Sequence, residues 1–297
     1  MKDIAILTEK RYLNPKPNNS YEQNIIKEDS LVQDELEKLG VSCKRVAWDQ
    51  NFSPSGFRFA IFRTTWNYFE EINNFMSFLS ACKNSISLIN SLDLILWNLD
   101  KRYLVLLKKL GVNIPETHIV NRGSGIDLLD VVNKCGWKDV VIKPCVSAAA
   151  WNTHYIKHRE LRGSTALFSS LSKNHDMMIQ SFQKNILSMG ELSFMIIGGE
   201  FSHAVLKRAK AGDFRVQDDF GGTVDVYNPK KSEINFALNV VNALPSRPAY
   251  ARVDVVFDNN GKIALSELEL IEPEMWFRFR PQAAKSLAKY IKNRVMD

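Results

Sequence analysis

The chain has 297 residues, of which 45% are hydrophobic and 24% are charged, proportions that are ordinary for a soluble globular protein with one large core or two or three small ones. No apolar run is long enough to cross a bilayer and the first residues lack the layout of a secretory signal, so we expect a cytoplasmic protein that does not bind membranes. The net charge of +6 suits anionic ligands such as nucleotides, the scattered basic residues argue against nucleic acid, and the four cysteines match no zinc pattern.

The first part of the chain, to about residue 90, alternates strand and helix patterns. Strands are expected at 3–8, 41–48, 57–66 and 85–90, and helices at 19–40 and 73–84. This order predicts a small parallel sheet covered by helices, and ligands usually bind at the carboxyl ends of the strands in such sheets.

The third of these strands ends in polar residues, which therefore lie at its carboxyl end. Arg63, Thr64, Thr65 and Trp66 are therefore candidates for holding a substrate, with helix capping and edge packing as alternatives of equal weight. Arg63 would clamp a substrate carboxylate and Trp66 would wall the pocket. In the competing interpretation Arg63 pairs with an acid such as Glu70 or Glu71 and holds the domain together.

The middle of the chain offers two lysines. Lys101 lies on the polar side of a helix expected over residues 97–110, where a lysine is by default solvated. Lys143 interrupts the apolar strand at 140–144, and a loop of small residues, from Ser147 to Ala150, follows it. A lysine in a strand is costly unless it pairs with an anion, and small residues let backbone N–H groups approach phosphate oxygens. Taken alone, this is a weak signal for phosphate binding.

The second half of the chain begins with a strand at 177–183. A hairpin at 190–208 turns at Gly198 and Gly199, and a polar loop that contains Arg215 follows. Helices are expected at 228–244 and at the basic, amphipathic C-terminal segment 283–295, which we expect to pack against the protein and not to bind a membrane.

An acidic hairpin lies near residue 260. The sequence DNNG at 258–261 indicates a turn between two strands. A turn at Asn260-Gly261 sets Asp254 opposite Glu267, and a turn at Asn259-Asn260 sets Arg252 opposite Glu267. Either two-residue turn leaves these side chains on one face of the sheet, whereas a three-residue loop would break the pattern.

Glu269 joins Asp254 and Glu267 on that face. Like charges on one face repel, so solvent, basic side chains or a metal must offset them. Three carboxylates within reach of one another suit a hard cation such as Mg²⁺. Ordinary solvated acids are an equally weighted alternative for this hairpin alone.

The order of these features resembles the ATP-grasp superfamily of ligases, in its glutathione synthetase and RimK-like branch. The matching segments, between about residues 95 and 275, are a lysine followed by LxxLGVxxPxT, VIKP with its small-residue loop, QSFQ, GELSFMIIGGEF, an arginine loop, and RVD with ELELIEP. RTTW, VIKP and ELELIEP are also similar to ATP-grasp ligases of D-cycloserine biosynthesis.

The resemblance implies an α/β protein, with α+β organisation in its C-terminal half: an ATP-grasp fold behind an N-terminal βαβ domain. We expect that N-terminal domain at 1–95, a small lid subdomain at 96–182, and a C-terminal subdomain with the metal site at 183–297.

The resemblance also implies a role for each matching residue. Contacts to ATP phosphates fall to Lys101, Lys143 and Ser147, the adenine segment is Gln180, Ser181, Phe182 and Gln183, and the ribose acid is Glu191. The implied catalytic residues are Lys143, Arg215 and Arg252, with Arg215 on the γ-phosphate or acyl phosphate. The implied ligands of one or two Mg²⁺ ions, or of Mn²⁺, are Asp254, Glu267 and Glu269. Two departures from the family stand out: Glu269 replaces the usual asparagine, and Ala148, Ala149 and Ala150 stand where glycine is frequent, which leaves open how the lid closes.

The implied activity is ATP-dependent ligation of a small carboxylic acid to an amine. An acyl phosphate forms first, an amide or peptide bond follows, and ADP and phosphate are released. The alternatives are a non-catalytic ATP-binding regulatory protein and a metal-dependent hydrolase that uses the same acids to activate water. The substrates are not identified by the sequence, and a homodimer would be common for the family.

Overall fold

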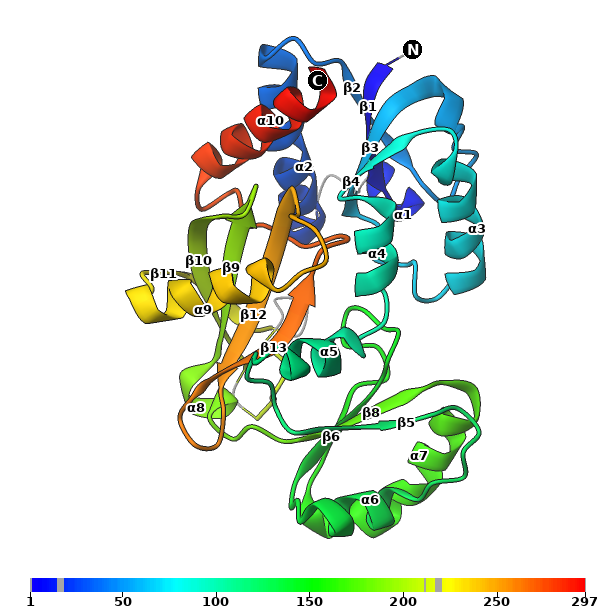
Figure 1. Ribbon diagram of the computed structural model, residues 1–297, viewed down its shortest axis with the longest axis vertical. Coiled ribbons are helices and arrows are strands. Elements are labelled where there is room, and N and C mark those ends of the chain that lie inside the picture. The colour runs from blue at the N-terminus through cyan, green and yellow to red at the C-terminus, as the bar shows by residue number, and fades with distance from the viewer. Residues whose placement is uncertain (1, 15–18, 211, 217–220, 297) are drawn as a thin grey trace.

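The computed structural model of the chain describes residues 2–14, 19–210, 212–216 and 221–296, and it contains three β-sheets (Figure 1). The first sheet is parallel, as the sequence predicts, and its strand order is β2-β1-β3-β4. Its strands are β1 (Lys2–Thr8), β2 (Cys43–Ala47), β3 (Phe57–Thr64) and β4 (Ser87–Ile89). The helices around it are α1 (Lys10–Leu13), α2 (Ser20–Lys38), η1 (Pro54–Gly56) and α3 (Ile72–Lys83).

The second sheet is antiparallel, in the order β5-β8-β6-β7, and lies at one end of the molecule (Figure 1). Its strands are β5 (Thr117–Val120), β6 (Val140–Pro144), β7 (His154–Ile156) and β8 (Met177–Ser181). Three helical segments that the sequence analysis did not anticipate accompany it: α6 (Leu128–Cys135), η2 (His158–Glu160) and α7 (Leu161–Asn174). Apolar residues of α6, α7 and the four strands form one buried cluster.

The third sheet is antiparallel, in the order β11-β10-β9-β12-β13. Its strands are β9 (Glu191–Ile197), β10 (Glu200–Arg208), β11 (Thr223–Tyr227), β12 (Tyr250–Phe257) and β13 (Ile263–Glu269). The helices that follow the chain through this half are α8 (Ile186–Met189), α9 (Lys231–Asn242) and α10 (Pro281–Met296). The hairpin of β9 and β10 turns at Gly198-Gly199, as predicted.

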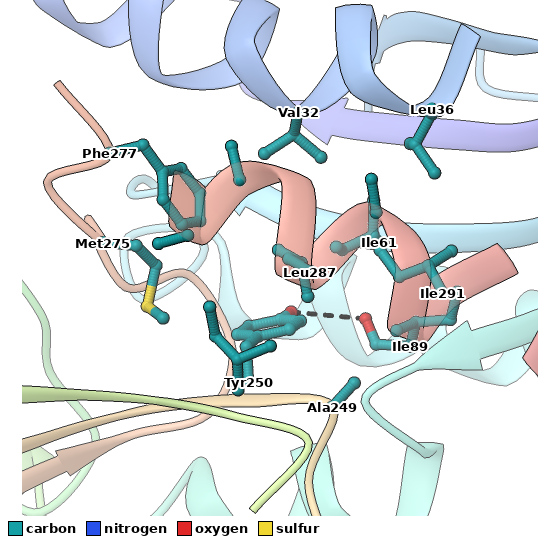
Figure 2. Close-up of a cluster of buried hydrophobic side chains, with 14 of the residues drawn as sticks. Val32, Leu36, Ile61, Ile89, Ala249, Tyr250, Met275, Phe277, Leu287 and Ile291 are labelled. Carbon is teal, nitrogen blue, oxygen red and sulfur yellow. Dashed lines mark hydrogen bonds between the residues drawn. The ribbon is translucent and has the colours of Figure 1, made fainter. Parts of the chain in front are cut away.

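The C-terminal helix α10 packs against the protein interior, as expected. Leu287 and Ile291 lie in the same buried cluster as Val32 and Leu36 of α2 (Figure 2). Tyr250 of the third sheet belongs to the same cluster, and its hydroxyl donates a hydrogen bond to the Ile89 carbonyl at 3.2 Å. The first and third sheets therefore share a core. None of the helices in the described part of the chain has the length and hydrophobicity of a membrane span.

The helix expected over residues 97–110 is interrupted. It consists of the end of α4 (Leu92–Asn98) and of α5 (Tyr103–Lys109), joined by a turn. Asp100 makes this turn by accepting the backbone N–H of Arg102 at 2.8 Å, and Lys101 N–H donates to the Cys145 carbonyl at 2.8 Å. Lys101 is only 7% exposed, so it is not the solvated lysine that its helical position suggested.

The acidic hairpin has a different turn from either of those expected. The Asp258 N–H donates to the Lys262 carbonyl at 2.7 Å, which leaves a three-residue loop, and Gly261 adopts a φ of +76° within it. An irregularity farther along the strands, where Ser266 is the extra residue, shifts the register back. Asp254 consequently pairs with Glu267 and Arg252 with Glu269. The predicted common face is correct, although the two-residue turn on which it was based is wrong.

Candidate functional site

A cleft of about 280 Å³ is lined by residues of the β3–α3 connection, the second sheet and the third sheet. All residues that the resemblance assigned to ATP, metal or catalysis line it: Lys101, Lys143, Ser147, Gln180, Ser181, Phe182, Gln183, Glu191, Arg215, Arg252, Asp254, Glu267 and Glu269. Of the four candidates at the end of β3, Trp66 alone belongs to this lining. The tertiary structure therefore gathers segments that are more than a hundred residues apart into one site.

Basic side chains hold the acids of the third sheet. The Arg252 guanidinium donates to both carboxylate oxygens of Asp254, at 2.9–3.1 Å, and also to Glu269. Lys207 Nζ lies 3.3 Å from Asp254 Oδ2 and also pairs with Glu191. Of the three ways in which the charges could be offset, the structure therefore shows basic side chains.

These pairs control the protonation of Asp254 and Glu269. Burial alone would raise the pKa of Asp254, but Arg252 and Lys207 favour its charged form and lower the pKa to about 2. Burial raises the pKa of Glu269 to about 7, although Arg252 opposes this effect. Asp254 thus stays ionised, whereas Glu269 titrates near neutral pH.

Glu267 lies close to two lysines of the cleft, Lys101 and Lys143. Lys101 Nζ donates to Glu267 Oε1 at 2.7 Å and to the Ser147 carbonyl at 2.6 Å. Burial would raise the pKa of Glu267, but Lys101 and then Lys143 lower it. The carboxylate is therefore ionised at neutral pH, and its side chain is 31% exposed to the cleft.

The oxygen atoms around this face can serve a magnesium ion only in part. Among the residues that the structure describes, no three carboxylate, histidine or cysteine side chains converge as a ready metal site. Glu267 and Glu269 face the cleft with side chains 31% and 22% exposed. Asp254 is 2% exposed and is already bonded to Arg252, Lys207 and Ser193. Two carboxylates thus fit Mg²⁺, which usually takes one or two from the protein and the rest from water and phosphate.

Lys143 and the loop after it, from Ser147 to Ala150, also line the cleft. Burial lowers the pKa of Lys143, and the lysine has no ion pair among the described residues. Ala149 and Ala150 adopt φ angles of +49° and +54°, the left-handed conformation that glycine takes freely and that costs an alanine about 1–2 kcal/mol. The loop thus keeps the backbone shape of a glycine-rich loop without the glycines.

The predicted adenine segment follows β8. Ser181 N–H donates to the Glu116 carbonyl at 3.0 Å and Phe182 N–H to the Asp139 carbonyl at 2.9 Å. Gln183 N–H has no acceptor among the described residues, so it is the backbone donor that a ligand could use. The Phe182 ring, which lines the cleft, stacks on Tyr155 with 3.9 Å between their centroids, so Phe182 lies where an aromatic base could be covered.

Arg63 and Thr64 are not part of the cleft. Arg63 is 1% exposed, with Nη2 3.3 Å from Glu28 Oε1 and Nε 3.6 Å from Asp29 Oδ1, both on α2. Thr64 also donates to Asp29, at 3.3 Å. The clamp expected at Arg63 is therefore corrected in favour of the ion-pair interpretation, with partners on α2 in place of Glu70 or Glu71. The reason is strand alternation, because Arg63 shares the α2-covered face of β3 with Ile61.

We expect Arg63→Met to lower the melting temperature and to leave ATP affinity unchanged. The substitution leaves buried Glu28 and Asp29 without this partner, which typically costs about 3–5 kcal/mol. Arg58→Met on the same strand is the matched control, because the Arg58–Asp3 pair is exposed and should contribute at most about 1 kcal/mol. An Arg63 variant of normal stability but altered substrate kinetics would contradict the structural role.

Sequence reasoning missed three charged cleft residues, Lys207, Glu272 and Glu274. Lys207 lies opposite Glu191 only because an irregularity near Ser202 shifts the register between β9 and β10. Glu272 belongs to the segment ELELIEP, but no role was assigned to it. Lys207 and Glu272 have no local sequence signal, since their partners come from distant segments: Glu191 of β9 for Lys207, and Tyr68 of the β3–α3 connection for Glu272.

Comparisons with known proteins agree with this geometry. Residues 4–90 match the model of the D-cycloserine synthetase DcsG N-terminal domain, and residues 104–272 match that of the prokaryotic glutathione synthetase ATP-grasp domain. The cycloserine biosynthesis protein DcsG of Streptomyces lavendulae is 26% identical over 271 residues, which cover 86% of this chain and 90% of that protein.

Solved structures show the same fold. The crystal structure of D-cycloserine synthetase DcsG has a TM-score of 0.86 at 22% identity and covers 98% of this chain and 99% of its own. D-Alanine–D-alanine ligase from Bacillus anthracis has a TM-score of 0.72 at 16% identity and covers 100% and 98%. At identities of 22% and 16%, these similarities show the fold alone.

Proposed function

Since the chain belongs to the ATP-grasp family, through the glutathione synthetase type of domain that spans residues 104–272, we propose that its cleft is the active site of an ATP-dependent carboxylate–amine ligase. The enzyme converts a carboxylate to an acyl phosphate and passes the acyl group to an amine, with release of ADP and phosphate. The observation that carries this assignment is one cleft that contains a lysine with no ion pair among the described residues, a small-residue loop, the aromatic side chain of Phe182 and cleft-facing carboxylates.

We assign the nucleotide to the side of the second sheet. Gln183 N–H is the available donor for adenine, and Phe182 covers the base. Lys143, whose ammonium lacks an ion pair among the described residues, binds phosphate oxygens as a point charge. Lys101 lies between Glu267 and the loop carbonyl of Ser147, so it fixes the loop beside the acids and can also reach phosphate.

We assign the metal to the acidic face of the third sheet. Glu267 and Glu269 would hold Mg²⁺, and Asp254 would join them only by giving up a bond to Arg252 or Lys207. When bound, the ion neutralises charge on the transferring phosphate. Arg252 and Arg215 supply further positive charge for the acyl phosphate, because Arg215 lines the cleft beside its partner Asp213.

Glu191 has a weaker claim to the ribose role. It pairs with Lys207 and accepts a hydrogen bond from Ser266 Oγ at 3.0 Å, inside the charged cluster. Its carboxylate would have to exchange one of these partners for a sugar hydroxyl. We therefore propose it as a positioning residue for Lys207 as well as a ribose candidate. A cytoplasmic location and small-molecule substrates complete the proposal.

The decisive experiment is a coupled assay of ADP formation with Mg²⁺ and ATP. Small acids and amines are supplied singly and in pairs, and products are identified by mass. We expect sustained ADP formation only when an acid and an amine are both present, or when one molecule carries both groups. A metal-dependent hydrolase would release product without an amine, and a regulatory protein would bind ATP without turnover. Either result would contradict the ligase assignment.

A further inference from the structure

Trp276, a cleft residue that the proposed function does not use, has an unusual backbone conformation. It lies in the segment after β13, lines the cleft and is 3% exposed. Its φ of +47° falls in the left-handed region, which is unfavourable for a bulky residue. Such a conformation persists only where the surrounding structure enforces it, and it is found most often at functional sites.

Two other elements enforce this conformation. The buried carboxylate of Glu28, on α2, accepts the backbone N–H groups on both sides of Trp276: that of Met275 at 2.7 Å and that of Phe277 at 2.8 Å. On β10, His203 Nε2 donates to the Met275 carbonyl at 2.9 Å. The first domain and the third sheet therefore both fix the backbone that carries the indole ring.

The ring of Trp276 lies against two cations of the cleft. The distance from the ring centroid is 5.1 Å to Arg252 Cζ and 5.7 Å to Lys207 Nζ, and both are within the range of a cation–π contact. Trp276 Nε1 is buried and has no hydrogen-bond partner among the described residues, so hydrogen bonding does not explain where the ring lies. In the same segment the Glu274 carbonyl accepts a hydrogen bond from Arg252 Nη1 at 3.4 Å. The segment thus holds Arg252 in addition to its two carboxylate partners.

We propose that Trp276 is a positioning residue for phosphoryl transfer, because its ring holds Arg252 and Lys207 in place beside the transferring group. The inference rests on the proposed function, in which Arg252 supplies positive charge for the acyl phosphate. Stabilisation of a transition state by charge is strongest where the charged groups are fixed and water is excluded. The side chains of Arg252 and Lys207 are 11% and 4% exposed, so the ring contacts cations that are already largely removed from water.

A purely structural role is the alternative, since Trp276 also belongs to the buried cluster shared by the first and third sheets. The two roles differ in what they affect. A structural residue stabilises the fold and acts equally on every ligand of the cleft. A positioning residue for phosphoryl transfer acts on the transferring group and not on the nucleotide that is already bound.

The experiment measures binding by calorimetry well below the melting temperature of each protein. One ligand is ADP with Mg²⁺, and the other is the same mixture with aluminium fluoride, a mimic of the phosphoryl group during its transfer. Wild type should bind the mimic more tightly than ADP alone. Trp276→Leu should weaken binding of the mimic about five- to thirtyfold, as for the loss of a cation–π contact to a desolvated cation, and should leave the affinity for ADP unchanged.

A second arm does not depend on the folding of Trp276→Leu. Fluorinated tryptophans, placed at position 276 alone, reduce the attraction of the ring for cations and almost conserve its shape. Affinity for the mimic should fall with each added fluorine, whereas Trp276→Phe, which keeps an aromatic face, should stay within about threefold of wild type.

Trp48→Leu is the matched control. Trp48 is 4% exposed and packs in the first domain outside the cleft, so its loss should lower the melting temperature and leave binding of the mimic unchanged.

The possible failures are distinguishable. Wild-type protein that binds neither ADP nor ATP would contradict the proposed function itself. Three results would overturn the role of Trp276 alone: a mimic that wild type binds no more tightly than ADP, equal losses for ADP and the mimic in Trp276→Leu, and fluorinated proteins that bind the mimic as wild type does.

Discussion

Glu267→Gln is expected to reduce ADP formation by at least about a hundredfold, since a metal-held charge in the transition state typically contributes several kcal/mol. Glu267 is ionised at neutral pH, because Lys101 and Lys143 lower its pKa, and its side chain faces the cleft. Glutamine keeps the shape and can still accept the hydrogen bond from Lys101, so the fold should survive. ADP formation is measured against Mg²⁺ concentration, with the melting temperature of each protein alongside.

Two controls accompany this variant. Glu200→Gln changes an exposed acid on β10, which is separated from Glu267 on β13 by two strands of the same sheet, and should retain full activity. Wild-type protein treated with a chelator should lose activity and recover it with Mg²⁺ or Mn²⁺. Full activity of Glu267→Gln, or activity that persists without divalent metal, would exclude the assignment of the acidic face to a metal.

The second large effect is expected at Lys143. Lys143→Met should weaken ATP binding about ten- to a hundredfold, the usual cost of one charge-assisted contact. The nucleotide-free protein should be as stable as wild type or more stable, because burial lowers the pKa of Lys143 and the charge has no ion pair among the described residues. Binding of ATP by calorimetry and the melting temperature without nucleotide are the two measurements.

Lys138→Met is the matched control for Lys143. Lys138 is exposed just before the same strand β6, so its loss should change neither quantity. Unchanged ATP affinity in Lys143→Met would return that lysine to a structural role. A large fall in stability would show that its charge is compensated in the folded protein.

Most elements were predictable, because strands and helices follow local periodicity. The parallel first sheet, the hairpin at Gly198-Gly199 and the C-terminal helix were recognised from apolar spacing and glycine positions. The order of motifs along the chain also indicated which residues would meet. Every ATP and metal candidate lines the cleft, although their individual roles remain proposals.

The errors share one cause. The periodicity of a sequence indicates which side chains share a face of a strand or helix. It does not indicate which other element will cover that face. Arg63 lies at the carboxyl end of its strand, as predicted, and only the position of α2 decided that it would be buried in an ion pair. Lys101 lies in a turn instead of on a helix surface because the Cys145 carbonyl, from another segment, accepts its backbone N–H.

The sequence by itself therefore determined the set of chemical groups and their order along the chain. The common face of Arg252, Asp254, Glu267 and Glu269 depends on the tertiary register, because the three-residue loop would have broken it without the irregularity at Ser266. The tertiary structure decided how these groups are paired. A three-residue loop and a compensating irregularity at Ser266 set the register of β12 and β13, and a second irregularity brought Lys207 to Glu191. It also left Glu272 without an ion pair among the described residues, although the charge of Lys101 acts on it. Such pairings depend on contacts between distant segments, whose energies are not encoded in any local pattern.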